Sequence, residues 1–449
     1  MLTDRIQEKL RELSTLPDVI TVGLGKKIIG ETYTDTIGIT FGVKAKEINP
    51  ENMLPTSVDI DGVTYLTDVI EVKNIEPVAC TVPTAYSNVI EKYLHSGVSM
   101  IGMYIDSFAD GIFYPIQGTL GFIAYHPENN ILVGVTAGHL FRDISESSTS
   151  GKGASWVGYA RAPMQSGSFD FNYPFLTYYP FYNGYEYKNG DFFRNYVGSS
   201  LYYKVLKVRN VTDPNRFNQI DAGLIGIDTS GNYGGTVVMT DRNNVPFELF
   251  PGYNSSWRSY QVKGIPEITS PMPFATTAEL NALVSSPPSF VSSSGCGSGA
   301  KNGTECGLKI DGIGVTTSTT FSTMPGPIYF DNLISFSRIT SGLPATLPGD
   351  SGAALLAKIG GIWKIIGMVI AGNETIGYAC RIDLLVSQLG IQAWDGSVKP
   401  LVNSKNSSDQ QTMSYLISPG INTEESIILN NNKYYQGGTI TFKSIGYYV

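Results

Sequence analysis

The feature that most constrains this fold is the alternation of short apolar runs with turn-forming residues between about residues 86 and 395. Residues 118–141, GTLGFIAYHPENNILVGVTAGHLF, show the pattern: two strand-like runs are joined by a turn at HPENN and followed by a second turn at AGH. Apolar runs bounded by Gly, Asn, Asp and Pro are typical of β-strands. Because recognisable helical stretches are few, the sequence predicts a mainly β body.

A chain of 449 residues is long enough for two or three domains, and the sequence divides into three parts. Residues 1–85 are predicted to form a small α+β domain that opens with an amphipathic helix, MLTDRIQEKLRELSTLPD, in which Ile6, Leu10 and Leu13 share one face. Residues 86–395 form the β body, with insertions expected at about 142–215 and 229–340. Residues 396–449 are predicted to be a linker and a short β-rich C-terminal extension, a candidate surface for a protein partner.

Charge and composition argue against several function classes. The net charge is -8 and no basic stripe is visible, which argues against a nucleic-acid partner. No apolar run has the length of a membrane span, and no signal peptide is visible, so we expect a cytoplasmic protein, or a virion protein if a phage encodes it. The turn DIDG lacks the further ligands of a calcium loop and GLGKK lacks the spacing of a phosphate loop, so no metal or cofactor is predicted.

The four cysteines are expected to be free thiols. Cys296 and Cys306 flank the loop GSGAKNGTE and would pair in an oxidising compartment. Without an export signal, the reduced state is the expectation.

The stretch LPATLPGDSGAALLAKIGG, residues 343–361, places Asp350 and Ser351 between two glycines just before an apolar run. An ordinary surface turn would use the same residue types. Acyl transfer by a serine also needs such a turn, because backbone N–H groups must meet the developing oxyanion. Without a Cβ, Gly349 lets its N–H and that of Ser351 point into one hollow, and Gly352 turns the chain away from the hydroxyl.

A serine nucleophile needs a base, and the chain has three histidines. His95 and His126 fall in polar or turn-like stretches, where we expect surface residues. His139 ends the apolar run ILVGVTAGH, whose small residues leave room for an imidazole at the mouth of a cleft. A hydrogen-bonded structural role for His139 is the alternative.

The carboxylate that orients the base should directly precede a buried strand. Asp221 stands in NQIDAGLIGI, between Ile220 and an apolar run. Its burial there requires a hydrogen-bond partner, and an imidazole N–H is suitable. Competing carboxylates lie in more polar contexts, where a solvated side chain is the default: Asp143, Asp213 and Asp228.

The three motifs occur in the order His, Asp, Ser. TAGH around His139, IDAGLIGI around Asp221 and PGDSGAAL around Ser351 resemble the three signatures of chymotrypsin-like serine proteases. GTLGFIA resembles a first-barrel strand of bacterial trypsin-like proteins, and residues 365–382, IIGMVIAGNETIGYACRI, resemble the strand–loop–strand wall of the family's substrate pocket. The resemblance covers about residues 115–390 and implies a chymotrypsin-like double β-barrel; residues 1–85 resemble the N-terminal extension of some bacterial and phage-type members.

The resemblance implies a catalytic role for each motif. Ser351 is expected to be the nucleophile, His139 the general base and then acid, and Asp221 the residue that fixes the imidazole. The N–H groups of Gly349 and Ser351 are expected to form the oxyanion hole.

The resemblance also assigns a substrate pocket. Since no acidic residue stands at the base of this pocket, an apolar P1 side chain is expected in place of Lys or Arg. The sequence departs from the family in having no Ile-Val-Gly-Gly-like start before His139, so Asp350 needs another partner, and in having an isoleucine where a serine is frequent. The residues assigned to the pocket are Ala345, Ile370, Ala371 and Gly372.

We therefore expect a serine endopeptidase that acts on a polypeptide substrate and processes a specific partner. The alternative is a catalytically silent structural or binding protein on a protease fold, such as a phage virion component. Esterase activity on the same residues is a further alternative, because it shares the chemistry of acyl transfer.

Overall fold

The protein is described here by a computed structural model. The residues that it describes are 2–29, 32–45, 54–73, 75–77, 96–97, 99–107, 112–128, 130–140, 170–171, 180–183, 196–204, 206–209, 216–227, 272–295, 307–321, 326–340, 343–373, 375–395, 427–429, 432–434 and 440–441.

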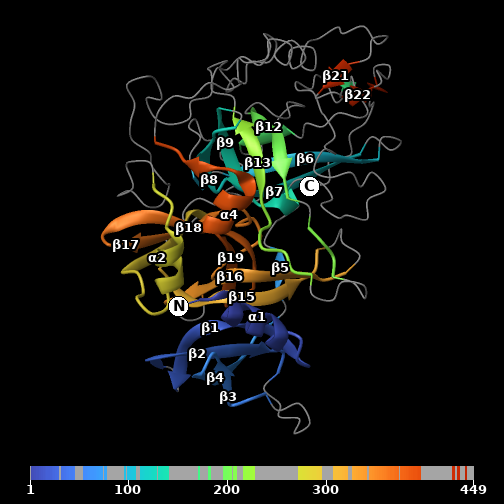
Figure 1. The fold of residues 1–449 in the computed structure, drawn as a ribbon. Helices are drawn as coiled ribbons and strands as arrows, with labels where there is room; N and C mark the ends of the chain where they lie inside the picture. Colours follow the sequence, from blue (N-terminus) through green and yellow to red (C-terminus); the bar gives the residue numbers. More distant parts are fainter. Residues whose placement is uncertain are drawn as a thin grey trace.

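The prediction of a mainly β protein is confirmed (Figure 1). The N-terminal elements are α1 (Asp4–Leu13), β1 (Val19–Ile29), β2 (Thr32–Val43), β3 (Ser57–Ile60), β4 (Val63–Glu71) and β5 (Glu76–Pro77). Thr3 caps α1 by accepting a hydrogen bond from the N–H of Ile6, as a threonine at this position commonly does. The apolar face of α1 is buried against the sheet, whereas β3 and β4 form a hairpin through Asp61 and Gly62, both at positive φ.

One 11-stranded sheet runs from this N-terminal unit into the body of the protein. The body strands in it are β14 (Phe290–Ser293), β15 (Leu308–Thr319), β16 (Ile328–Arg338), β17 (Ala354–Ile359), β18 (Ile362–Gly372) and β19 (Ile376–Arg381). Their pairings lead from β14 through β17, β18, β19, β16 and β15 back to β14, so these six strands form a ring of hydrogen-bonded neighbours. β1 pairs with β15 beyond that ring and extends the sheet through β2, β4 and β3.

A second, eight-stranded sheet lies on the opposite side of the six-stranded ring from the N-terminal unit (Figure 1). Its strand order is β20-β8-β9-β13-β12-β11-β6-β7, and all neighbouring strands in it are antiparallel. In the described part of the chain no pairing joins β7 to β20, so the double barrel stays a prediction for this sheet. The bounds are β6 (Ser99–Ser107), β7 (Ile112–Thr119), β8 (Phe122–His126), β9 (Ile131–Thr136), β11 (Pro180–Asn183), β12 (Tyr196–Tyr203), β13 (Gly223–Ile227) and β20 (Gln392–Ala393).

Two short pairings involve the C-terminal extension. β21 (Ile427–Leu429) pairs with β22 (Asn432–Tyr434), and β23 (Ile440–Thr441) pairs with β10 (Asp170–Phe171). The extension therefore contains strands, and one of them pairs with a strand outside the extension.

The ranges expected to be insertions differ from what the structure contains. β11 and β12 lie within residues 142–215, and β14, β15 and β16 lie within residues 229–340, yet all five belong to the two large sheets. In β15 the alternation of apolar and polar residues is interrupted: Leu308 and Ile310 are out of phase with Ile313 and Val315, and the register with β16 shifts between them.

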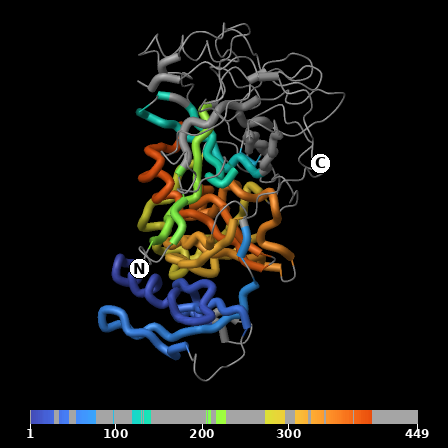
Figure 2. The backbone as a smooth tube through the Cα atoms, turned by 90° about the vertical axis from the view of Figure 1, so that its right-hand side faces the viewer, coloured from blue at the N-terminus to red at the C-terminus, as the bar shows by residue number. Residues whose placement is uncertain are grey.

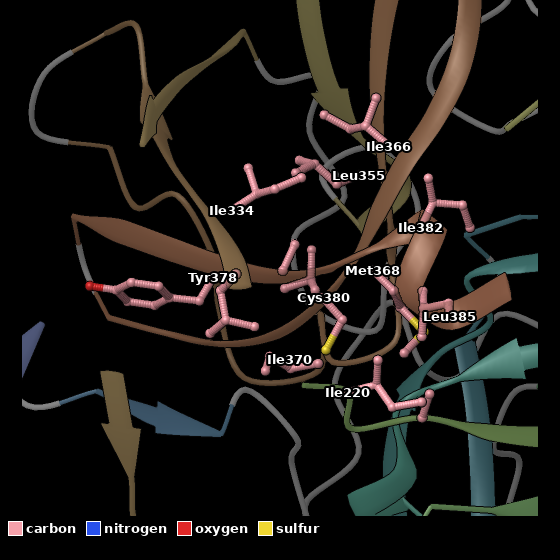
Figure 3. Packing of buried hydrophobic residues seen from close by; sticks show 14 of the residues in the cluster. Ile220, Ile334, Leu355, Ile366, Met368, Ile370, Tyr378, Cys380, Ile382 and Leu385 are labelled. Carbon is pink, nitrogen blue, oxygen red and sulfur yellow. The ribbon is translucent and has the colours of Figure 1, made fainter. Parts of the chain in front are cut away.

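The core of the ring is packed against α4 (Ile382–Leu389), as Figure 3 shows. Met368 on β18 and Leu385 on α4 face each other there, and both are fully buried. Ile220, which comes from the segment before β13, enters the same cluster beside Ile370. The residue after Ile220 is thereby held at the boundary between the two sheets.

Loss of the Leu10 side chain should destabilise the packing of α1 on the sheet. Leu10 is fully buried, so Leu10→Ala should cost about 2–5 kcal/mol and lower the midpoint of thermal unfolding. Glu8→Ala on the exposed face of the same helix is the control and should change stability by less than about 0.5 kcal/mol. Equal midpoints for the two variants would show that the packing of α1 does not contribute to stability.

Candidate active site

His139 lies in a short 3-10 turn, Gly138–Leu140, that directly follows β9. Gly138 is required there by close approach: a Cβ on it would lie 2.7 Å from Oδ1 of Asp221 and 2.9 Å from the backbone N of Ala222. The small residues before His139 therefore let the turn pack directly against the segment that carries Asp221.

Asp221 is brought to this turn by the pairing of β13 with β9, in which Gly223 stands opposite Thr136. Its carboxylate is fully buried and accepts two hydrogen bonds from His139. The backbone N–H of His139 donates to Oδ1 at 2.9 Å, and the ring Nδ1 lies 2.5 Å from Oδ2. These bonds offset the cost of burying a carboxylate.

Ser351 reaches the same place from the other sheet, in the turn that precedes β17. Gly349 and Gly352 adopt φ angles of 107° and 91°, which only glycine adopts readily. The turn is clamped to β7: the N–H of Thr119 donates to the carbonyl of Ser351 at 2.8 Å, and its hydroxyl donates to the carbonyl of Gly349 at 2.8 Å. The candidate site is thus built across the contact between the two sheets.

The three side chains form one continuous chain of hydrogen bonds. Nε2 of His139 lies 2.8 Å from Oγ of Ser351, on the side of the ring away from Asp221. An ionised carboxylate can only accept, so the Nδ1 proton of His139 is directed at Asp221 and Nε2 is left to accept the serine proton. This is the arrangement in which an imidazole can act as a general base toward a hydroxyl.

The turn around Ser351 also presents two free backbone donors. In the part of the chain that the structure describes, the N–H groups of Gly349 and Ser351 donate to no acceptor. The neighbouring N–H groups are used: that of Asp350 donates to Leu347, and that of Gly352 donates to Val369. One free donor belongs to the residue that carries the hydroxyl and the other to the glycine two positions before it, as an oxyanion site requires.

The residues assigned to the pocket lie on two segments of the ring. Ile370, Ala371 and Gly372 form the end of β18, and Ala345 lies ahead of the serine turn; all four are buried. Thr346 fills space beside them, since a Cβ on Gly372 would lie 2.2 Å from its hydroxyl oxygen. Gly377 on β19 stands opposite Gly372, and the ring of Phe336 fills the space beside it, 2.3 Å from where Gly377 would carry a Cβ.

Both departures from the family pattern find partners in this chain. Oδ2 of Asp350 accepts a hydrogen bond from the N–H of Leu347 at 2.9 Å, so the turn supplies its own partner. The side chain of Ile370 offers no hydroxyl, but its backbone oxygen lies 3.4 Å from Oγ of Ser351, farther than the 2.8 Å to Nε2 of His139, which takes the hydroxyl proton. The backbone of this position therefore lies beside Ser351 although its side chain is apolar.

Two residues beside the three side chains are absent from the sequence-based assignment. Sγ of Cys380 accepts a hydrogen bond from the backbone N–H of Asp221 at 3.3 Å. Phe321 covers the ring of His139, with the ring centroids 5.2 Å apart. Cys380 lies within the predicted wall segment YACRI, so its position was open to inference, whereas no pattern marks Phe321.

The structure also settles the place of some rejected candidates. The sequence predicts that His126 lies at the surface, and this is wrong: it ends β8, is 8% exposed, and its pKa is lowered by burial. Its Nε2 lies 3.8 Å from where Gly390 would carry a Cβ, at the C-terminal end of α4. The other rejected residues lie outside the described residues: His95, Asp143, Asp213 and Asp228.

A cavity of about 290 Å³ lies away from this site, between β1 and β19. Thr21, Gly23 and Tyr378 are among the residues that line it, and none of the three candidate catalytic residues or the assigned pocket residues does so. We therefore do not take this cavity as the candidate active site, because an active site requires reactive side chains that lie close together.

No group of metal-binding side chains and no membrane-spanning helix is found in the described ranges. His, Cys, Asp and Glu side chains nowhere gather in threes at metal-binding distances within them. The helices that they contain are too short or too polar to cross a membrane.

Comparisons with known proteins give neighbours among solved structures alone. No protein-family model and no curated protein matches the chain. Similar structures include protease A of Thermobifida fusca (14% identity, 68% of this chain and 100% of that one, TM-score 0.30). A glutamic acid specific serine protease (15%, 67% and 100%, 0.28) and the chymotrypsin of Cellulomonas bogoriensis (13%, 67% and 98%, 0.28) are also similar. These neighbours are serine proteases, but at such low TM-scores the function has to be argued from the side chains of this chain.

Cys380 should resist alkylation in the folded protein. It is fully buried, and burial raises the pKa of its thiol, as does the nearby Asp221. Because a thiol reacts through its thiolate, iodoacetamide at pH 8 should modify Cys380 only after unfolding. Mass spectrometry of peptides from native and denatured samples measures this; rapid modification of the native protein would contradict the burial of this residue.

Proposed function

We propose that this protein is a serine endopeptidase that hydrolyses peptide bonds through an acyl-enzyme. The observation that carries the proposal is the unbroken hydrogen-bond chain from Asp221 through His139 to Ser351. The free N–H groups of Gly349 and Ser351 support it, because an isolated structural histidine would need no donors aimed beside its serine partner.

Each residue then has one task in the reaction. His139 takes the proton of Ser351 as Oγ attacks the substrate carbonyl, and the N–H groups of Gly349 and Ser351 stabilise the oxyanion. His139 next gives that proton to the leaving amine, and an acyl ester on Ser351 remains. Water, deprotonated by His139, hydrolyses the ester and restores the serine hydroxyl. Asp221 holds the ring and stabilises its charged form throughout.

A fluorophosphonate probe should label wild-type protein and leave Ser351→Ala unlabelled. An activated serine forms a covalent adduct with such a probe, whereas an ordinary hydroxyl does not. Ser335→Ala is the matched control, because Ser335 is a buried serine on β16 outside the hydrogen-bond chain.

Asp221→Asn should slow hydrolysis by about 10⁴-fold, since it leaves the imidazole in the wrong tautomer. Folded wild type that is never labelled would favour a catalytically silent protease fold.

Peptides with an apolar P1 residue should be cleaved at least about tenfold faster than those with Lys or Arg. No carboxylate is assigned to the pocket, and a buried cation without a partner is costly. Ala345→Asp should raise cleavage after Lys and Arg, and Ala345→Asn, which adds no charge, should not. Kinetics on a peptide library with one varied position measures the preference; faster wild-type cleavage after Lys or Arg would contradict this pocket assignment.

A further inference from the structure

Along the edge of β18 that passes Ser351, the backbone groups form hydrogen bonds first with β17 and then with the turn that carries Ser351. β17 pairs with it as far as Met368, and the N–H of Val369 then donates to Ala353 at 2.8 Å. The carbonyl of Val369 accepts a hydrogen bond from the N–H of Gly352 at 2.8 Å, and the carbonyl oxygen of Ile370 lies 3.4 Å from Oγ of Ser351. The other edge of β18 pairs with β19 from Gly367 to Gly372, so it offers no room for a further strand.

The next backbone groups on the edge beside Ser351 belong to Ala371 and Gly372. A peptide bond can be attacked by Ser351 only if the substrate lies extended beside the nucleophile. An exposed strand edge holds such a peptide through backbone hydrogen bonds that are independent of its sequence. The two residues of β18 just beyond Ser351 are therefore the place where the backbone of a substrate would pair.

That place is already taken by the chain itself. β5 pairs with β18 in antiparallel register, with Glu76 opposite Gly372 and Pro77 opposite Ala371. Since Pro77 has no N–H, the pair of Glu76 and Gly372 is the one that can exchange both ladder hydrogen bonds. Figure 1 shows β5 as a short strand beside the orange strands of the ring, and in Figure 2 the light-blue chain rises from the N-terminal unit and runs alongside them.

The residues before β5 are fixed to both the N-terminal unit and the body. The hydroxyl of Thr319, on β15, donates to the carbonyl of Ile75 at 2.9 Å, and Ile75 is buried. The side-chain amide of Asn373 donates to the carbonyl of Lys73 at 3.1 Å, and the N–H of Val72 donates to Val43 at 2.8 Å. We call residues 72–73 and 75–77 the strap.

We propose that the strap occupies the substrate edge of β18 and holds the protease closed until it is displaced. This rests on the proposed function, and it assigns the regulation of the same site. A strap in the same molecule competes at a high effective concentration, so a peptide in solution cannot easily replace it. The closed state agrees with the burial of the triad: Ser351 and Asp221 are fully buried and His139 is 8% exposed.

Thr319→Val tests the strap through a single hydroxyl. The change keeps the shape of the side chain and removes the hydrogen bond to Ile75. Thr317→Val is the matched control: Thr317 lies on the same strand, is 3% exposed like Thr319, and donates to the carbonyl of Ile20, outside the strap. Each variant loses one hydroxyl-to-carbonyl bond to the N-terminal unit, but only Thr319→Val loosens the strap.

The kcat/KM for a short chromogenic peptide with an apolar P1 residue should rise about fivefold in Thr319→Val and stay at the wild-type value in Thr317→Val. The rate follows the fraction of open molecules, and one hydrogen bond shifts that fraction by about this factor. Fluorophosphonate labelling, with Ser351→Ala as its control, is measured on the same samples. Labelling with equal kcat/KM in the two threonine variants would overturn the strap proposal and leave the proposed function intact. Absence of labelling in every folded variant would overturn the proposed function and the strap with it.

A second pair of variants acts on β5 directly. Glu76→Pro removes the backbone donor opposite Gly372, whereas Glu76→Ala changes only an exposed side chain. Acetyl-Asn-Ile-Glu-Pro-amide, which copies residues 74–77, should inhibit peptide hydrolysis by Glu76→Pro competitively and leave wild type and Glu76→Ala unaffected. Equal inhibition of all three proteins would show that the edge is open in the wild type and would overturn the proposal.

Discussion

The candidate site depends on the buried contact between Asp221 and His139. A carboxylate that is fully removed from water needs donors, and it receives them from the backbone N–H and the ring of one histidine. This requirement fixes the orientation of the imidazole, and with it the direction of Nε2. Ser351 then needs only to be brought within hydrogen-bond distance, which the turn of residues 348–353 does from the opposite sheet.

Polar contacts cross the junction between the two sheets. Thr119 binds the turn of Ser351 through its N–H and its hydroxyl, and Thr136 donates to the carbonyl of Thr119 at 2.8 Å. Gly352 must be glycine in this setting, because a Cβ would lie 2.2 Å from the hydroxyl of Thr136. The serine is thus positioned by a network that crosses the junction, and small shifts between the sheets would break the contact with His139.

The N-terminal unit belongs to the same construction. β1 continues the sheet of the body by pairing with β15, and Arg11 on α1 donates to the fully buried carboxylate of Asp331 on β16. The pKa of Asp331 is raised, chiefly because burial disfavours its charged form, while Arg11 acts in the opposite direction. An element that is so firmly joined to the ring is a suitable anchor for a strap that reaches the site.

The sequence by itself determined the local features: the mainly β body, the helix at residues 4–13, and the glycines that frame Ser351. It also marked His139, Asp221 and Ser351 as candidates, because each stands in a local context that suits its chemistry. Only the tertiary structure decided that these three meet, that Cys380 and Phe321 lie beside them, and that His126 is buried. The position of the strap could not be predicted from the sequence either, because Glu76 and Gly372 are distant in sequence and meet only through the pairing of β5 with β18. The physical reason is that local patterns fix the backbone of a segment, whereas contacts between distant segments depend on how strands pair and sheets pack.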